Sequence, residues 1–585
     1  MYPRLAILLA LQLILGASHE HVSAEPPPPA ARAESEPVEV GRGGQGPILE
    51  RSDREFLPHA GKRVRRIHIQ ALVVFGPSLD DTTRSTTSGL ARILNNLNFR
   101  TRETTIRRHL LFKEGDAIDP FRLADSERIL RTLAFIGDAR ILVVPIPESA
   151  DSADVLVIVK ESWALTLSGS LKEGNRLKVK LAQQNLLGLG HRVSAAVTLI
   201  PDGTSRFGFD MSYAVPNILG SFINGELEYR NMPGQKMAGL ALSRGLIPHV
   251  LRYAGGLNLR QTSIEVEDSL GTAADNTSDL IDLWAGIPLD LKLKPHMRER
   301  RPILIVSGRV RHLKFTRRPP VTPSTFQQYH DMNYYLGSLA LIQSRYYRAN
   351  LLYNFGRTED IPCGFLARVT CGLADEEFIQ DSYASATLAV GEQRDGLGYG
   401  AGELRIGGYP RGGAIERGVI RLRTLYFSGL LHAGGFRVRQ FAKAEYTAGI
   451  HRSADDGINF SGAEGIRGIV YNDEVIGSKR LLLNLETVAF TPWKAWGFSF
   501  AFFTFADLDI IASGDTTAPA QGYYSGLGLG VRVGSEAYGV GPLQLRFAWY
   551  PRLPVDHAAY SYTAFGEERF RAIEFLGAMP DIVEY

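Results

Sequence analysis

Two charged residues near the C-terminal end of the chain have the types and spacing to form a buried ion pair. Arg467 lies in the loop tetrad IRGI at 466–469, and Asp507 ends the segment FAD that begins at Phe505. A guanidinium and a carboxylate that share a poorly solvated interior are stabilised when they pair. We therefore expect Arg467 to bond Asp507. The alternative is an ordinary surface loop with a solvated arginine.

Four neighbours of this pair are expected to support it. Glu486 lies on the polar face of its segment, as Asp507 does on the polar face of the next one. Glu486 is therefore a second acceptor for Arg467. Gly468 would let the loop backbone approach a wall closely. Phe505 would pack beside the guanidinium, and Ile466 completes the motif on the other side of Arg467.

The elements that must position these residues alternate with a period of two. The apolar faces of two such segments carry Leu481, Leu483 and Leu485, and then Phe498, Phe500 and Phe502. Polar residues lie on the opposite faces. A strict alternation with a large apolar face is typical of a membrane barrel strand, whose apolar side meets lipid and whose polar side meets the lumen. Alternating segments separated by turn clusters continue from Trp163 onward, so we expect a mainly β fold with an antiparallel transmembrane barrel over 163–585.

Motifs for catalysis are absent from the sequence. It contains no G-x-S-x-G, H-E-x-x-H, phosphate loop or C-x-x-C, and its 13 His are scattered. Two Cys make a weak metal site, and we read them as structural. We expect no catalytic, cofactor-binding or metal-binding residue, and hence no enzyme. A hydrolase assembled from an Asp, a His and a Ser on distant strands is the alternative.

The N-terminal third divides into three parts. Residues 1–24 read as a signal peptide, with Arg4, an apolar stretch and a small-residue cleavage site. Residues 25–62 are rich in Pro, Gly and charge, which predicts a disordered linker. Residues 63–162 predict a compact domain in the order strand, helix, helix, strand, strand, with Asp119-Pro120 starting the second helix. The net charge of +3 argues against nucleic acid as a partner.

The barrel motifs resemble those of the BamA/TamA superfamily. The tetrad IRGI followed by a strand ending in NLE is similar to the sixth extracellular loop and following strand of that superfamily, and FADLD is similar to its F-x-D-x-G motif. Ile469 replaces the usual aromatic, and Asp509 stands where the second motif has Gly. The first-strand region contains the N-x-x-G-x-G stretch of the family as Asn185, Gly188 and Gly190.

The domain before the barrel is similar to a POTRA domain, the periplasmic module that precedes barrels of this family. The resemblance is carried by TRETTIRRHLLFKEGDAIDPFRLADSERILRTLAFIGDARI and DVLVIVKES. It implies one POTRA domain at 63–162 in the periplasm and a barrel of about sixteen strands in the outer membrane of a Gram-negative cell. In POTRA domains, exposed sheet edges accept extended client segments by strand addition.

The implied function is assembly, insertion or translocation of proteins at the outer membrane. Client strands would enter through the POTRA domain and through a lateral seam between the first strand, near Leu165–Lys172, and a short last strand, Phe570–Phe575. The implied partners are unfolded or extended polypeptides, the bilayer and its lipopolysaccharide, and periplasmic accessory proteins. The basic segment 298–320 would meet lipid phosphates or form a solvated loop face. The alternative functions are a passive outer-membrane pore and a barrel-embedded hydrolase.

Overall fold

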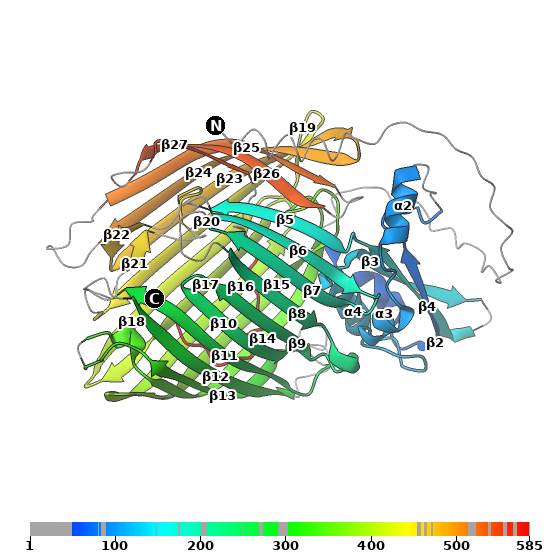
Figure 1. Ribbon diagram of the computed structural model, residues 1–585. Helices are drawn as coiled ribbons and strands as arrows, with labels where there is room; N and C mark the ends of the chain where they lie inside the picture. The colour runs from blue at the N-terminus through cyan, green and yellow to red at the C-terminus, as the bar shows by residue number, and fades with distance from the viewer. Residues whose placement is uncertain are drawn as a thin grey trace. The chain divides into compact units, whose positions relative to one another are not determined.

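The computed structural model describes residues 50–583, with gaps at 80, 84–88, 148, 173–175, 201–206, 248–249, 268–272, 291–301, 324, 453–457, 461–464, 470–471, 513–521, 536–539, 554–557 and 565–569. The predicted signal peptide and residues 25–49 of the predicted linker lie outside the described residues. The described chain forms a small α/β domain and a large antiparallel barrel (Figure 1).

The small domain is a three-stranded sheet with helices. Its elements are β2 Arg63–Leu72, α2 Gly89–Leu97, α3 Glu103–Arg108, α4 Pro120–Thr132, β3 Ile136–Ile146 and β4 Ser149–Glu161. The central strand β4 is parallel to β2 and antiparallel to β3. Helix α4 begins with Asp119 as its N-cap and Pro120 in its first turn. Helix α2 is not part of the predicted order, which contained two helices between the first and second strands.

The core of this domain is formed by alternate residues of the sheet and one face of the helices. Its fully buried side chains include Ile106, Leu123, Leu130, Ile141, Val155, Val157 and Val159. Within the described residues, no helix is both long enough and apolar enough to cross a membrane.

The predicted linker extends too far toward the C-terminus. Residues 50–62 contain the short strand β1, Glu50–Arg51, and the 3₁₀ helix η1, Arg54–His59. Phe56 of η1 is buried in the core of the small domain, and β1 pairs with a barrel strand at Tyr347 and Arg348. Composition alone missed this because a single buried aromatic holds a segment that is otherwise polar.

The large sheet contains 22 strands within the described chain, and two of them, β1 and β19 (Leu431–Ala433), are short additions. The long series runs through β5 Leu165–Lys172, β6 Arg176–Leu186, β7 His191–Leu199, β8 Phe207–Val215, β9 Asn224–Met232, β10 Gln235–Arg244, β11 Ala254–Glu267, β12 Ala273–Asp290, β13 Ile303–Arg317, β14 Met332–Ala349, β15 Glu359–Glu376, β16 Ile379–Arg394, β17 Gly398–Arg411, β18 Ala414–Phe427, β20 Phe436–Ile450, β23 Lys479–Ala495, β24 Phe498–Ala512, β25 Gly522–Ser535, β26 Val540–Arg552 and β27 Tyr560–Ala564. Successive members pair antiparallel. A separate pair, β21 Ile458–Phe460 and β22 Asn472–Gly477, lies in the connection before β23.

The mainly β fold with an antiparallel barrel is confirmed, and two details of the prediction are wrong. The sheet has more strands than the expected count of about sixteen. Residues Phe570–Phe575 are not the last strand, since they have no strand structure and their apolar side chains are buried. The last strand of the described residues is β27, which pairs with β26 over only five residues. In the strand order of the sheet, β27 is followed by β5, so the first and last members of the long series are neighbours.

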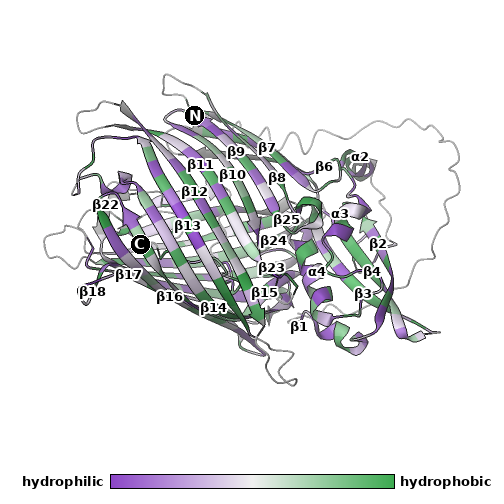
Figure 2. Ribbon diagram, turned by 90° about the horizontal axis from the view of Figure 1, so that it is seen from below, coloured by the Kyte–Doolittle hydropathy of each residue, from purple (hydrophilic) through white to green (hydrophobic). Residues whose placement is uncertain are grey.

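The two faces of the barrel wall differ in chemistry. Large apolar side chains alternate outward along the strands, and some are more than half exposed, such as Val390 at 60% and Leu545 at 63%. The inward positions hold buried polar residues, among them Arg368, Glu403, Lys443 and Asn484. Figure 2 shows the resulting alternation of hydrophilic and hydrophobic colour along β11–β14. An apolar outer band around a polar interior is the pattern that a bilayer selects.

A closed ladder in which each backbone group bonds to its neighbouring strand should resist detergent until it is heated. We expect an unboiled sample in dodecyl sulfate to migrate differently from a boiled one on a gel. Identical mobility of the two samples would contradict the barrel.

Candidate functional site

The arginine of the IRGI tetrad is held in the barrel interior by strand β24. Arg467 is 3% exposed and Asp507 is 2% exposed. The Arg467 Nε donates to Asp507 Oδ1 at 3.1 Å and to Oδ2 at 3.0 Å, and Nη2 donates to Oδ1 at 2.9 Å. The backbone N–H of Arg467 also donates to Asp507 Oδ2, at 3.0 Å. One carboxylate therefore fixes both the side chain and the backbone of the loop.

A second acid completes a charge network around this arginine. Glu486 of β23 accepts from Arg467 Nη1 at 2.5 Å and, through its other oxygen, from Arg532 Nη2 at 2.7 Å. Asn484 donates to Asp507 Oδ1 at 2.8 Å. Two guanidinium groups thus face two carboxylates. This balance matters because an unpaired charge at such burial would be strongly destabilising.

The backbone of the loop is seated closely on the wall. Gly468 has φ +88°, and a Cβ at this position would lie 2.3 Å from the hydroxyl of Tyr550. That hydroxyl donates to the carbonyl of Arg467 at 2.8 Å. A side chain at position 468 would therefore be strained and would displace the tyrosine. The ring of Phe505 lies under the guanidinium, 4.3 Å from Cζ to the ring centroid. Ile466, at the other side of the arginine, is buried.

The residue that replaces a glycine in the second motif has a partner of its own. Asp509, fully buried on β24, accepts from Arg480 of β23 at 2.6 Å and 3.0 Å. The two strands thus carry a second ion pair one inward position beyond Asp507. Period-two parity alone indicates that Asp507 and Asp509 share a face, but nothing in the spacing identifies Arg480 as the partner.

The structure does not bring the predicted first-strand residues to the Arg467 network. Asn185, Gly188 and Gly190 form the β6–β7 turn, which contacts the small domain instead. Asn185 donates to the carbonyl of Phe99 at 3.2 Å and to the hydroxyl of Thr101 at 3.0 Å. A Cβ at Gly188 would lie 2.2 Å from the carbonyl oxygen of Arg100, so glycine permits the close approach. This stretch is therefore a docking turn.

A buried cluster of charges between the small domain and the barrel was missed by sequence reasoning. Arg131 of α4 donates to both oxygens of Asp360 on β15, at 2.8 Å and 2.6 Å, and also bonds Glu127 one turn earlier. Glu127 is paired in addition with Arg348 of β14, at 2.7 Å. The i, i+4 spacing of Glu127 and Arg131 was visible, but Asp360 lies 229 positions away from Arg131.

The electrostatics of this cluster favour the charged arginine. Burial opposes the charge of Arg131, but the carboxylates of Asp360 and Glu127 together raise the pKa of its guanidinium above the ordinary value. The neighbouring turn of the barrel adds hydrogen bonds to the small domain, because Arg357 donates to the carbonyl of Arg131 at 2.7 Å and to that of Ile136 at 3.0 Å.

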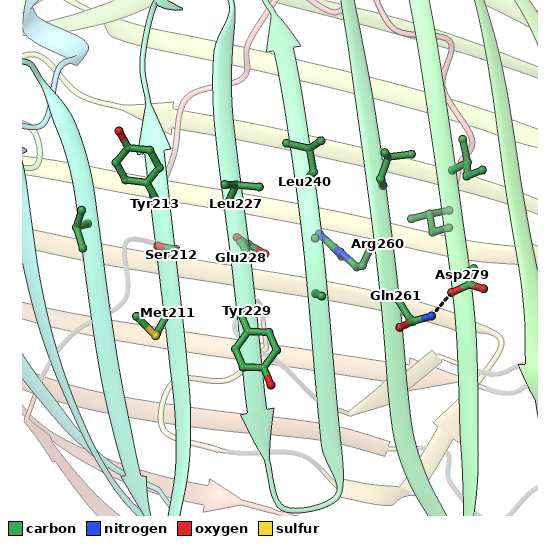
Figure 3. Close-up of a pocket in the computed structure, with 16 residues that line it drawn as sticks. Met211, Ser212, Tyr213, Leu227, Glu228, Tyr229, Leu240, Arg260, Gln261 and Asp279 are labelled. Carbon is green, nitrogen blue, oxygen red and sulfur yellow. Dashed lines mark hydrogen bonds between the residues drawn. The ribbon is translucent and has the colours of Figure 1, made fainter.

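A shallow hollow of about 790 Å³ lies elsewhere, on strands β7–β12 (Figure 3). Its apolar lining includes Met211, Tyr213, Leu227 and Tyr229, all of them exposed on the outward face. The alternation places Ser212 and Glu228 on the opposite side of the same strands. The hollow is thus part of the apolar outer surface and is separate from the Arg467 network.

The chemistry of the Arg467 network is that of a brace. Each of its carboxylates is engaged by a guanidinium, so it presents no free base or nucleophile. Within the described part of the chain, no three His, Cys, Asp or Glu residues are grouped as a metal site. Cys363 and Cys371 are both free thiols.

The fold and the site together define a β-barrel with an inward-folded, ion-paired loop, preceded by a small α/β domain. No family model and no curated protein matches the chain. Its structure is similar to that of BamA from Haemophilus ducreyi lacking POTRA domains 1–3, at 10% identity and a TM-score of 0.37 over 86% of this chain and 85% of that one. It is also similar to CdiB from Acinetobacter baumannii (10% identity, TM-score 0.41, 86% and 73% covered) and to CdiB from Escherichia coli (10%, 0.35, 90% and 91%).

Removal of Arg467 should be more damaging than removal of either acid. Arg467→Ala leaves the buried Asp507 carboxylate without a guanidinium, although Glu486 keeps Arg532. Asp507→Ala leaves Arg467 bonded to Glu486. Breaking a buried pair typically costs about 3–5 kcal/mol, and we expect a loss of that order in the free energy of unfolding for Arg467→Ala. Chemical unfolding of the purified barrel in detergent measures it.

The double change Arg467→Ala/Asp507→Ala should be little worse than Arg467→Ala alone, because the two side chains act as one unit. Arg317→Ala is the matched control, since its ion pair with Asp275 is exposed and should contribute about 0–1 kcal/mol. Fully additive losses at Arg467 and Asp507 would contradict the network.

Removal of one partner of the interdomain cluster should loosen the small domain. We expect Arg131→Ala and Asp360→Ala to accelerate limited proteolysis of the small domain in the full chain, with little further effect when they are combined. Arg65→Ala serves as the control, because its ion pair with Asp154 lies on the exposed side of the same domain. Unchanged cleavage in all variants would show that the cluster does not hold the two parts together.

Proposed function

We propose that this protein is an outer-membrane factor that inserts or translocates polypeptides, and that clients enter at the junction of β5 and β27. The observation that carries the proposal is the short pairing of β27, whose ladder to β26 covers only five residues. When such a strand separates from its neighbour, the edge that it leaves is a template for another extended chain.

The geometry of β27 supports this choice of entry point. Its ladder to β26 spans five residues, whereas β14 and β15 pair over eighteen. A short ladder has few hydrogen bonds to break, so β27 can separate from its neighbours at the lowest cost. A client strand would then add to the free edge by backbone pairing.

The Arg467 network would keep the rest of the wall fixed while the junction opens. It links the loop to β23 and β24, and through Arg532 to β25. These strands lie next to β26 and β27 in the sheet. A rigid support beside a weak edge confines opening to that edge.

In this proposal the small domain is a POTRA-like module in the periplasm. Its outer strands, β2 and β3, each pair only with β4 in the three-stranded sheet of the described chain. Segment 115–118 bonds to β2 at Val64, and Glu127 bonds to β3 at Ile141. The rest of each edge suits the capture of extended clients by strand addition. The buried Arg131 cluster would transmit the position of the captured segment to the barrel.

The remaining partners follow from the two surfaces of the barrel. The apolar outer face suits a bilayer, with lipopolysaccharide as its outer-leaflet component and periplasmic accessory proteins at the small domain. The basic strand β13 contributes less to lipid binding than its sequence indicated, because Arg309 points inward and pairs with Asp282 at 2.6 Å.

A cross-link across the junction should stop the activity. We expect cysteine pairs placed between 165–167 of β5 and 560–562 of β27, in a Cys363→Ala/Cys371→Ser background, to block client insertion when oxidised and to release it on reduction. The readout is assembly of a radiolabelled barrel client in proteoliposomes. Matched cysteine pairs between β14 and β15 should have no effect. Full activity of the oxidised junction would overturn the proposed route.

Depletion of the protein tests the function class itself. We expect outer-membrane proteomics to show a loss of particular barrel or surface proteins. Normal levels of all of them would refute an assembly role. A large steady conductance would then favour a passive pore, and activity abolished by one Ser or His change would favour a hydrolase.

A further inference from the structure

The C-terminal segment 570–583 lies against the inner wall of the barrel. It follows the last strand, and the buried side chains of Phe570, Ile573, Phe575 and Ala578 belong to the interior apolar cluster. Its partners are inward-facing wall residues of β13, β15, β16, β17 and β18.

The segment follows strand β16 along its length. Phe575 meets Gly391 near one end of this strand. Further along, the hydroxyl of Ser385 donates to the carbonyl of Asp581 at 3.2 Å. At the other end, the backbone N–H of Val583 donates to the hydroxyl of Tyr383 at 2.7 Å. Eight extended residues cover about 26 Å, close to the thickness of a bilayer core, so the segment runs lengthwise through the barrel.

The wall contains a buried charge whose ion-pair partner lies in this segment. Arg368 of β15 is 7% exposed, and its carboxylate partner is Asp581, 2.6 Å away. The same guanidinium donates to the carbonyl of Met579 at 3.0 Å. Without the segment, this guanidinium would lose its ion-pair partner and keep only the longer-range attraction of Glu403. Nearby, Arg309 donates to the carbonyl of Pro580 at 2.9 Å.

Two glycines of the wall provide room for the side chains of the segment. A Cβ at Gly391 would lie 2.6 Å from the ring of Phe575, and a Cβ at Gly407 would lie 2.9 Å from the Cβ of Val583. Any larger residue would push the segment off the wall. The inner wall therefore fits segment 570–583 in three ways: by hydrogen bonds, by an ion pair and by its shape.

We propose that the inner wall of β15–β17 is a binding groove for an extended peptide with acidic and apolar side chains, and that residues 570–583 fill it in cis as a plug. The plug closes the lumen to ions and leaves when the barrel is in use. It is a property of the barrel itself and does not depend on which client the protein handles.

The test is ion conductance of the purified full chain in planar bilayers of pure phospholipid in KCl. Truncation after residue 569 and, in the full chain, Asp581→Arg should each raise the ratio of open to closed time by about tenfold or more, equivalent to about 1.4 kcal/mol. A synthetic peptide of residues 570–585 should close the truncated barrel again, whereas a scrambled peptide should not. Equal conductance of the three proteins would overturn the proposal, and Asp581→Arg decides the matter if the truncated chain does not refold.

A covalent lock provides the second arm. In the Cys363→Ala/Cys371→Ser background, Gly407→Cys and Val583→Cys should cross-link, because a small shift brings their Cβ atoms into the disulfide range of about 3.5–4.5 Å. The lock should abolish openings until it is reduced. Gly400→Cys with Val583→Cys is the control that should not cross-link, since Gly400 is exposed on the same strand. Failure of the 407–583 bond to form, or openings that persist when it is formed, would refute the plug. Since no client is present, neither result bears on client insertion.

Discussion

Charge balance inside a closed wall is the constraint on which the rest of this structure depends. The inward face of the barrel buries arginines and acids at a depth where none of them is tolerated alone. Arg467 therefore holds Asp507 and Glu486 together, Arg480 accompanies Asp509, and the loop that carries Arg467 must fold inward to supply its guanidinium. The buried acids of β23 and β24 therefore determine where the loop that carries Arg467 lies.

The pairing of Arg467 with Asp507 was proposed from two signals, the polar-face parity of Asp507 and the resemblance of IRGI and FADLD to the family motifs. Alternation with a period of two reveals which residues share a face, and the polar face of a membrane strand must point to the lumen. The same reasoning failed for Phe570–Phe575. Its apolar residues indicated a strand against lipid, but they pack against the inner wall, and an apolar pattern does not distinguish these two apolar surroundings. The number of strands could not be predicted from the sequence either, because it depends on how the sheet closes.

The sequence also did not predict the contacts between residues that are far apart in the chain. Nothing near Arg131 indicates Asp360, and nothing near Asn185 indicates that its amide meets Phe99 and Thr101. Glycines were visible as motif residues, but their roles follow from what approaches them: a tyrosine hydroxyl at Gly468 and a backbone carbonyl at Gly188. A contact was therefore predictable from the sequence where both of its residues lie on, or directly beside, one pair of neighbouring strands.

The long separation in sequence between the final segment and its partners constrains the order in which the molecule forms. Arg309 and Pro580 are bonded across 271 positions, and Arg368 and Asp581 across 213. Contacts of such high order carry a large loop-closure cost and form late. The wall must exist before these last residues have anything to bind. The chain terminus can therefore settle inside only after β13 and β15, which carry Arg309 and Arg368, have joined the wall.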